Sequence, residues 1–239
     1  MTGPHTAPAA TSPPAVVVLD VNETLSDMAP LAVRFAELGA SPLLAASWFA
    51  ALLRDGFALA AAGASAPFAQ IGTEVLRTLL DGEDLDRGLD DAVDHVMSGL
   101  VELDVHPDVP DGLRALSAAG LRVVTLSNGS ASVARRLLTR AGVAQHLEMM
   151  LSVEDAGVWK PAPGAYAHAA GRCGVDVADL MLVAVHPWDV DGAARAGLRT
   201  AWVNRTGSAY PAHFRRPDVE VASLGQLAER LRSRPPGRG

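Results

Sequence analysis

The sequence predicts an α/β protein whose core is a doubly wound, Rossmann-like parallel sheet and which carries an inserted all-helical cap domain. Three observations predict this fold. Short, continuous apolar runs, typical of strands buried on both faces of a parallel sheet, recur along the chain. Segments with helical periodicity separate these runs, as in repeated strand–helix units. One long stretch, residues 28–105, contains only helix-period segments.

Five apolar runs are expected to form strands of the core. The first ends at Asp20. The predicted strands cover residues 15–19, 121–126, 180–185, 199–203 and 219–222. The helices expected between them cover residues 111–119, 130–141, 163–173 and 192–196. Strand and helix alternate, as a doubly wound sheet requires.

The same patterns divide the chain into a core, a cap and two tails. We expect residues 15–27 and 106–230 to form the core and residues 28–105 the cap. Cap helices are expected at residues 31–38, 42–62, 67–80 and 89–101. The ends, residues 1–14 and 231–239, are rich in small and Pro residues and are predicted to be disordered. An insert of this kind often acts as a lid over a site.

Composition restricts the partners and the compartment. The 239-residue chain has a net charge of −7, which argues against nucleic-acid binding. The N-terminus has no secretory signal pattern, and charges interrupt the longest apolar stretches, so no membrane partner is expected. The single cysteine, Cys173, fits a reducing compartment, so a cytoplasmic protein is expected. The Ala- and Leu-rich cap helices could support a homodimer, but they could equally pack on one another.

Polar side chains follow three predicted strands at the edge where open α/β sheets bind ligands. Asp20 follows the first strand, Ser127 and Asn128 the second, and His186 and Asp189 the third. An aspartate nucleophile needs donors that orient it, a cation that keeps it ionised and a base for water. The positions after these strands can supply donors and a second carboxylate.

Each of these residues also has an ordinary structural interpretation. Asp20 could cap a helix or form an Asx turn, and Lys160, the candidate cation, could be a solvated loop lysine. Tyr166 could be a helix-face aromatic residue, and Trp188 could pack beneath the site. The functional interpretation therefore depends on these residues occurring together, within motifs that follow one another in a specific order.

Four motifs occur in a specific order: D-V-N-E-T-L at 20–25, S-N-G at 127–129, K-P-A-P-x-x-Y at 160–166 and W-D-x-x-G-A at 188–193. Together they resemble the haloacid dehalogenase superfamily, and the chain is most similar to its type II L-2-haloacid dehalogenases. The resemblance covers residues 16–224 and includes V-N-R-T-G at 203–207.

The resemblance implies a hydrolytic dehalogenase that acts on small 2-haloalkanoic acids through a covalent aspartyl ester. Asp20 would displace the halide with inversion, and Asp189 would position or deprotonate the hydrolytic water. Lys160 would neutralise the carboxylates. The implied catalytic residues are Asp20, Thr24, Ser127, Asn128, Lys160, His186 and Asp189. Substrate contacts are expected from Val21, Asn22, Trp48, Phe49, Tyr166 and Trp188.

A magnesium-dependent phosphatase of the same superfamily is the alternative. Such phosphatases usually carry an aspartate two residues after the nucleophile, but Asn22 occupies that position and cannot transfer a proton. They also carry an acidic metal ligand where this chain has Val185. These two differences favour chemistry without a metal or another cofactor.

The chain also departs from the dehalogenase pattern. Phe49 stands where those enzymes usually have a halide-binding arginine, and His186 stands where they have an asparagine. His186 could act as a base near neutral pH or could be a structural histidine bonded to the backbone. We expect Trp48, Phe49 and Phe57 to form an apolar wall over Asp20, with packing in the cap core as the alternative. A catalytically weakened binding protein of the same fold is a third interpretation.

Overall fold

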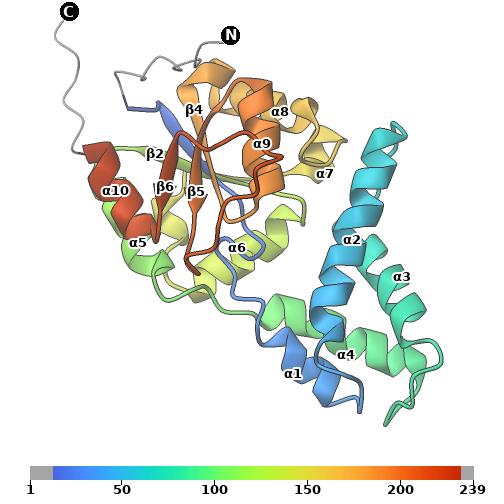
Figure 1. Ribbon diagram of the computed structural model, residues 1–239. Helices are drawn as coiled ribbons and strands as arrows, with labels where there is room; N and C mark the ends of the chain where they lie inside the picture. The colour runs from blue at the N-terminus through green and yellow to red at the C-terminus, as the bar shows by residue number, and fades with distance from the viewer. Residues whose placement is uncertain (1–12, 233–239) are drawn as a thin grey trace, which may run out of the picture.

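The computed structural model describes residues 13–232 (Figure 1). The predicted disordered tails fall almost entirely outside the described residues. The prediction that the C-terminal tail begins at position 231 is wrong, because helix α10 continues to Arg232. Its apolar residues Leu224, Leu227 and Leu231 recur at helical spacing and are buried.

The described residues of the core form one parallel sheet of six strands, in the order β3-β2-β1-β4-β5-β6. The strands are β1 (Val16–Leu19), β2 (Arg122–Ser127), β3 (Met149–Ser152), β4 (Leu180–Ala184), β5 (Arg199–Val203) and β6 (Val219–Val221). β1 lies in the middle, and Leu19 is in register with Thr125 of β2 and Val183 of β4. The residues that follow β1, β2 and β4 therefore meet at one edge of the sheet.

Helices cover both faces of this sheet (Figure 1). They are α5 (Val109–Ala118), α6 (Ala131–Arg140), α7 (Val153–Ala156), α8 (Pro163–Cys173), α9 (Pro187–Ala196) and α10 (Leu224–Arg232). Val17 and Leu19 of β1 point into the layer with α5, α6 and α10, whereas Val16 and Val18 point into the layer with α8 and α9. This alternation buries both faces of β1 and confirms the predicted doubly wound α/β class.

Four helices lie to one side of the sheet (Figure 1). They are α1 (Leu31–Ala36), α2 (Leu44–Ala61), α3 (Phe68–Leu80) and α4 (Leu89–Glu102). The chain enters and leaves this helical region side by side, since Ser26 and Val105 form an antiparallel bridge. No other strand pairing occurs between these two residues, which agrees with the all-helical prediction for the insert.

Three core elements, β3, α7 and α10, were not predicted, and one helix begins more than a turn before its predicted start. β3 has the sequence MMLS, whose apolar run is only three residues long and lacks the β-branched residues typical of strands. α10 follows the short strand β6 and was not predicted. α9 begins at Pro187, earlier than the predicted residue 192, with Pro in its first turn.

Helix α2 is the one helix within residues 13–232 that is long and apolar enough, by length and composition alone, to cross a membrane. Helices of soluble protein cores pass the same test, so this observation is weak evidence for a membrane span. In the structure α2 packs against α1 and α3, and it buries Trp48, Phe49, Leu52 and Gly56.

Candidate active site

Asp20 leaves the end of the central strand and is almost completely buried. Its backbone N–H donates to the carbonyl of Val183 in the neighbouring strand (3.0 Å). The hydroxyl of Thr24 donates to Asp20 Oδ2 (2.6 Å) and accepts from the backbone N–H of Val185 (3.1 Å). The turn after β1 is thus fastened to β4, and it fixes the orientation of the Asp20 carboxylate.

Lys160 is the only lysine of the chain and is fully buried. Its ammonium group donates to Asp20 Oδ1 (2.8 Å) and to Asp189 Oδ2 (2.6 Å). The side-chain amide of Asn128 bonds both backbone groups of Lys160, with Lys160 N donating to Oδ1 (2.9 Å) and Nδ2 donating to the Lys160 carbonyl (3.2 Å). Asn128 therefore positions Lys160 through two hydrogen bonds.

Tyr166 holds the second carboxylate of the cluster. Its hydroxyl donates to Asp189 Oδ1 (2.6 Å), and the Asp189 carbonyl lies 3.1 Å away. Gly192, one turn along α9, permits this approach, because a Cβ there would come within 2.8 Å of the Tyr166 hydroxyl and 2.5 Å of Pro161 Cβ. Burial, followed by the charge of Asp189, raises the pKa of Tyr166 well above its usual value, so the hydroxyl remains a donor.

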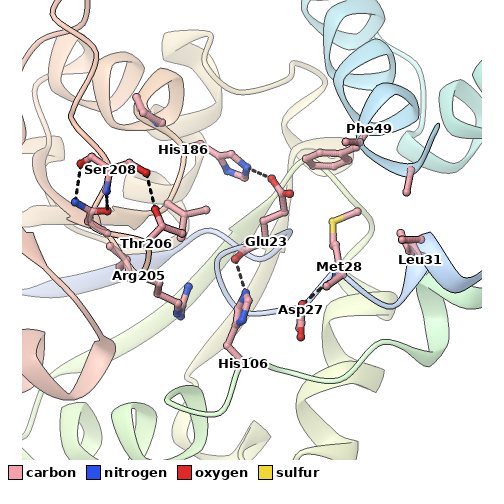
Figure 2. Close-up of a pocket in the computed structure, with 18 of the residues that line it drawn as sticks. Glu23, Asp27, Met28, Leu31, Phe49, His106, His186, Arg205, Thr206 and Ser208 are labelled. Carbon is pink, nitrogen blue, oxygen red and sulfur yellow. Dashed lines mark hydrogen bonds and ion pairs between the residues drawn. The ribbon is translucent and has the colours of Figure 1, made fainter. Parts of the chain in front are cut away.

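His186 joins two carboxylates instead of a backbone group. Its Nδ1 lies 3.1 Å from Asp20 Oδ2, and its Nε2 lies 2.8 Å from Glu23 Oε2 (Figure 2). Glu23 adopts a left-handed backbone conformation (φ 59°), and His106 Nε2 donates to its carbonyl (2.9 Å). Left-handed residues other than glycine are uncommon. Here this conformation directs the Glu23 carboxylate back toward the site.

The cluster keeps its nucleophile candidate ionised. Burial by itself raises the pKa of Asp20, but Lys160 and His186 outweigh burial and hold that pKa well below its usual range. Burial by itself lowers the pKa of Lys160, but the charges of Asp189 and Asp20 raise it above the ordinary value. Burial, together with repulsion from Asp20, raises the pKa of Asp189 in spite of the Lys160 charge.

The pKa of His186 is raised to about 9: burial lowers it, but hydrogen bonds to Asp20 and Glu23 outweigh that effect. His186 is therefore a cation at neutral pH. The alternative of a histidine bonded to the backbone is wrong, because both ring nitrogens lie against carboxylates, and the raised pKa argues against the other alternative, a base near neutral pH. The reason is the second carboxylate, Glu23, which no sequence motif associated with His186.

Ser127, Val21 and Asn22 lie together at a small cavity of about 100 Å³ between the core and the cap. The Ser127 hydroxyl accepts from the backbone N–H of Gly129 (2.9 Å). Phe68 of the cap also lines this cavity. These three predicted residues therefore surround a space beside the turn that carries Asp20.

Aromatic rings cover the other side of the turn. The Phe49 ring centre lies 6.2 Å from that of His186, and Trp188 stacks on His186 at 5.0 Å. Phe57 contacts Trp188 edge-on at 4.9 Å. The predicted apolar wall thus contains Phe49 and Phe57, with Trp188 as a further member.

Trp48 does not belong to this wall. Its indole N–H donates to the carbonyl of Gly72 (2.9 Å), and its ring packs between α2 and α3 inside the cap. The expectation that Trp48 contacts substrate is corrected accordingly. Trp48 and Phe49 are neighbours on a helix, so their side chains point in different directions and only one of them faces His186.

A second, larger cavity of about 680 Å³ opens beside His186 and Glu23 (Figure 2). Phe49 and Met28 border it from the cap side, and Arg205 lies at its core side. The turn after β1 therefore contributes to two cavities, through Val21 and Asn22 on one side and through Glu23 on the other.

Trp159 and Glu23 are the site residues that the sequence analysis missed. Trp159, immediately before Lys160, stacks on Phe68 at 6.0 Å, and its indole N–H donates to the carbonyl of Ala66 in the cap (3.0 Å). The sequence signal for Trp159 was its large apolar side chain directly before the lysine motif at 160–166. The signal for Glu23 was its place within the motif at 20–25.

The donor set between Asp20 and Asp189 does not fit a divalent metal ion. The Lys160 ammonium occupies the position between the two carboxylates, bonded to both. Val185, at the place expected for a further acidic ligand, supplies no side-chain oxygen. Within residues 13–232, no group of three or more His, Cys, Asp or Glu side chains is arranged to hold a metal ion.

A sequence model of the haloacid dehalogenase-like hydrolases matches residues 14–197. The chain belongs to this family of hydrolases, as its fold and buried aspartate–lysine cluster indicate. Within the family it is similar to (S)-2-haloacid dehalogenases. The enzyme "(S)-2-haloacid dehalogenase 4A" of Burkholderia cepacia is 31% identical over 88% of this chain and 91% of its own length.

Other relatives agree with this assignment. The (S)-2-haloacid dehalogenase of Pseudomonas sp. (strain YL) is 36% identical over 51% of this chain, and the match spans 53% of that relative's length. The chain thus matches about half the length of the first curated relatives. Among solved structures, a dehalogenase with an intermediate complex has a TM-score of 0.86 and 29% identity, covering 94% of this chain and 100% of its own.

A structure of L-2-haloacid dehalogenase from Xanthobacter autotrophicus, with chloropropionic acid covalently bound, has a TM-score of 0.81 and 25% identity. It covers 92% of this chain and 98% of its own. The fold of this chain therefore matches that of an enzyme captured in a covalent complex.

Proposed function

We propose that this protein is a hydrolytic 2-haloacid dehalogenase that works through a covalent ester on Asp20. One observation carries the proposal. The Asp20 carboxylate is buried, ionised and held between Lys160, Thr24 and His186, with a second carboxylate, Asp189, bonded to the same lysine. The names of its relatives and the covalent complex of a structural neighbour support this chemistry.

In the first step, an oxygen of Asp20 attacks C2 of the 2-haloacid, a C–O bond forms, and the C–halogen bond breaks with inversion. The halide leaves with the bonding electron pair and needs no proton. Oδ1 of Asp20 has one hydrogen-bond partner, Lys160, whereas Oδ2 has two, Thr24 and His186. Oδ1 thus keeps more lone-pair freedom, and we assign the attack to it.

In the second step, water attacks the ester carbonyl carbon of Asp20 and releases a 2-hydroxy acid with inverted configuration. Asp189 takes the proton from the water, and the raised pKa of this carboxyl suits it to that role. The released alkoxide accepts a proton as the carboxylate of Asp20 is restored. Tyr166 and Lys160 hold Asp189 in place throughout.

His186 supplies the second positive charge that the site requires. Phe49 stands where relatives of this type usually carry a halide-binding arginine, and its ring lies 6.2 Å from the His186 ring. The His186 cation, bonded to Asp20 and Glu23, lies at the same mouth of the site. Electrostatic stabilisation of a leaving group by a fixed cation is a major source of rate acceleration.

The deciding experiment compares two substrates with and without metal. The protein is incubated with L-2-chloropropionate and with p-nitrophenyl phosphate, each in EDTA and in Mg²⁺, and chloride and phosphate are assayed. We expect chloride release that EDTA does not change and that Asp20→Asn abolishes. Phosphate release that requires Mg²⁺, without chloride release, would instead establish the phosphatase alternative. If neither chloride nor phosphate is released, and Asp20→Asn still binds L-2-chloropropionate, the protein is a binding protein of this fold.

We also propose that the enzyme needs no cofactor, works in the cytoplasm and forms a homodimer through its cap, residues 28–105. Leu43 and Val33 of the cap are 79% and 58% exposed, which supports a contact between copies at this surface. The single thiol, Cys173, is buried and unpaired, as is usual in a reducing compartment. Light scattering of the purified chain tests the dimer, and a monomer would reject it.

A further inference from the structure

The cavity beside His186 is much larger than a small haloacid requires. Its volume is about 680 Å³. The small cavity at Ser127 and Asn22, about 100 Å³, already offers space for a carboxylate end. A large, preformed space next to a reactive group is typical of a site for a larger ligand.

Both walls of the large cavity are mainly apolar. On the cap side they include Met28, Leu31 and Ala45, next to Phe49 (Figure 2). On the core side they include Val185, Pro187, Trp202 and Val203. An alkyl or aryl group placed between these walls would be removed from water on two sides, which favours its binding.

Most polar groups at this cavity already have partners, but Nη1 of Arg205 is buried and has no hydrogen-bond partner among the described residues. The Arg205 guanidinium donates to the Asp108 carboxylate (3.0 and 3.3 Å) and to the Thr24 carbonyl (2.9 Å). Asn204 and Ser208 bond each other twice. The carboxylates of Glu23 and Asp27 also line the space, and they oppose an anionic group there.

Asp20 does not itself line the cavity, but His186 lies between the cavity and Asp20. His186 lines the cavity, and its Nδ1 lies 3.1 Å from Asp20 Oδ2. A substrate whose C2 lies at Asp20 would direct a long substituent past the His186 ring, whose two nitrogens lie against Asp20 and Glu23, and past the apolar ring of Phe49.

We propose that the preferred substrates are 2-haloacids with a long alkyl or an aryl substituent, and that the cavity between Ala45 and Val185 binds this substituent. The inference rests on the proposed dehalogenase function. Burial of each additional methylene group strengthens binding. Specificity for long chains thus comes from this cavity, whereas the reaction itself depends on Asp20.

The test compares L-2-bromooctanoate with L-2-bromopropionate, which share a leaving group and differ only in chain length. Bromide release by the full chain is expected to give a kcat/KM at least about tenfold higher for the longer acid. Equal values, or a preference for bromopropionate, would overturn the inference but leave the proposed function intact. No bromide from either acid would reject the proposed function.

Ala45→Trp tests the place of binding. The new side chain fills the cavity, so kcat/KM for bromooctanoate should fall at least about tenfold while that for bromopropionate stays within about twofold. The matched control is Ala50→Trp, on the same helix at an exposed position outside the lining of the cavity, which should change neither value. Equal losses with both acids in Ala45→Trp would contradict binding in this cavity.

An inhibition measurement with the unaltered protein avoids any folding defect of the variant. Octanoate should inhibit bromopropionate turnover competitively, with an inhibition constant at least about tenfold lower than that of propionate. Equal inhibition constants would reject the cavity as a binding site for alkyl chains.

Discussion

Gly56 of α2 lies directly against the indole ring of Trp159: a Cβ at position 56 would come within 2.4 Å of the ring atoms Cε3 and Cζ3. Trp159 precedes Lys160, and its indole N–H donates to the carbonyl of Ala66. The longest cap helix and the loop carrying Lys160 are therefore in contact through a glycine and a buried ring. The position of the cap is coupled by packing to the position of Lys160.

This contact predicts that Gly56→Ala destabilises the protein. The added methyl group must displace the Trp159 ring, and overpacking of this kind costs about 1–3 kcal/mol in the free energy of unfolding. Urea unfolding measures the change. The control is Gly171→Ala in helix α8, where nothing lies within 4 Å of the new Cβ and alanine should be neutral or stabilising. Equal stability of the Gly56 variant and the unaltered protein would contradict the close packing.

Asp20→Asn should remove halide release almost completely, because an amide cannot act as the nucleophile. A loss of at least about 1000-fold in kcat is expected. Intact-mass spectrometry after brief reaction should show an ester adduct on the unaltered protein and none on the variant. Asp55→Asn, at an exposed ion pair with Arg54, is the matched control and should keep both activity and adduct. An adduct on the Asp20 variant would place the nucleophile elsewhere.

His186 should give the activity a basic limb, because its pKa is about 9 and its cationic form bridges Asp20 and Glu23. The kcat/KM is expected to fall as pH rises through about 9, and this limb should disappear in His186→Gln at a lower overall rate. A profile that stays flat to pH 10.5 would rule out the cationic role.

The same residue makes folding stability depend on pH. The folded-state pKa of His186 lies above its ordinary value of 6.5, so its contribution is complete below about 6.5 and is lost as pH rises through about 9. The difference in unfolding free energy between the protein and His186→Gln should therefore be on the order of 1–3 kcal/mol larger at pH 6 than at pH 10. Thermal unfolding at the two pH values measures it, and an unchanged difference would contradict the prediction.

Tyr166→Phe should weaken both the fold and the second chemical step. It removes the donor to the buried Oδ1 of Asp189, at a cost of about 1–3 kcal/mol in unfolding free energy. Hydrolysis of the ester should slow about tenfold or more, so the adduct should accumulate. Tyr210→Phe is the control, because its hydroxyl bonds only the carbonyls of Pro187 and Arg215. If the ester adduct accumulates in the Tyr210 variant, or fails to accumulate in the Tyr166 variant, Tyr166 has no role in hydrolysis of the ester.

Much of this architecture could be predicted because buried parallel strands leave a continuous apolar run in the sequence. The run before Asp20 and the polar residues after β2 and β4 identified the edge where the side chains meet. Strand β3 could not be recognised in this way, because its apolar run, residues 149–151, is only three residues long and contains no β-branched residue.

The cluster around Asp20 was predictable in part, but the contacts of its members were less so. Lys160 and Asp189 meet Asp20 as expected from the motifs. The charge of His186 depends on Glu23, whose left-handed backbone conformation no local pattern announces. Residue type alone does not tell which tryptophan lies at the boundary between cap and core. The directions of the side chains place Trp159 at this boundary and Trp48 in the cap interior.

Residue 160 is the chain's sole lysine and has no exposed surface. The folded protein therefore offers amine-reactive labels no exposed side-chain target. Modification at that position can occur only during excursions in which the aspartate–lysine cluster becomes solvated. The labelling rate of the peptide that contains Lys160 thus reports how often this cluster becomes exposed to solvent, without any engineered probe.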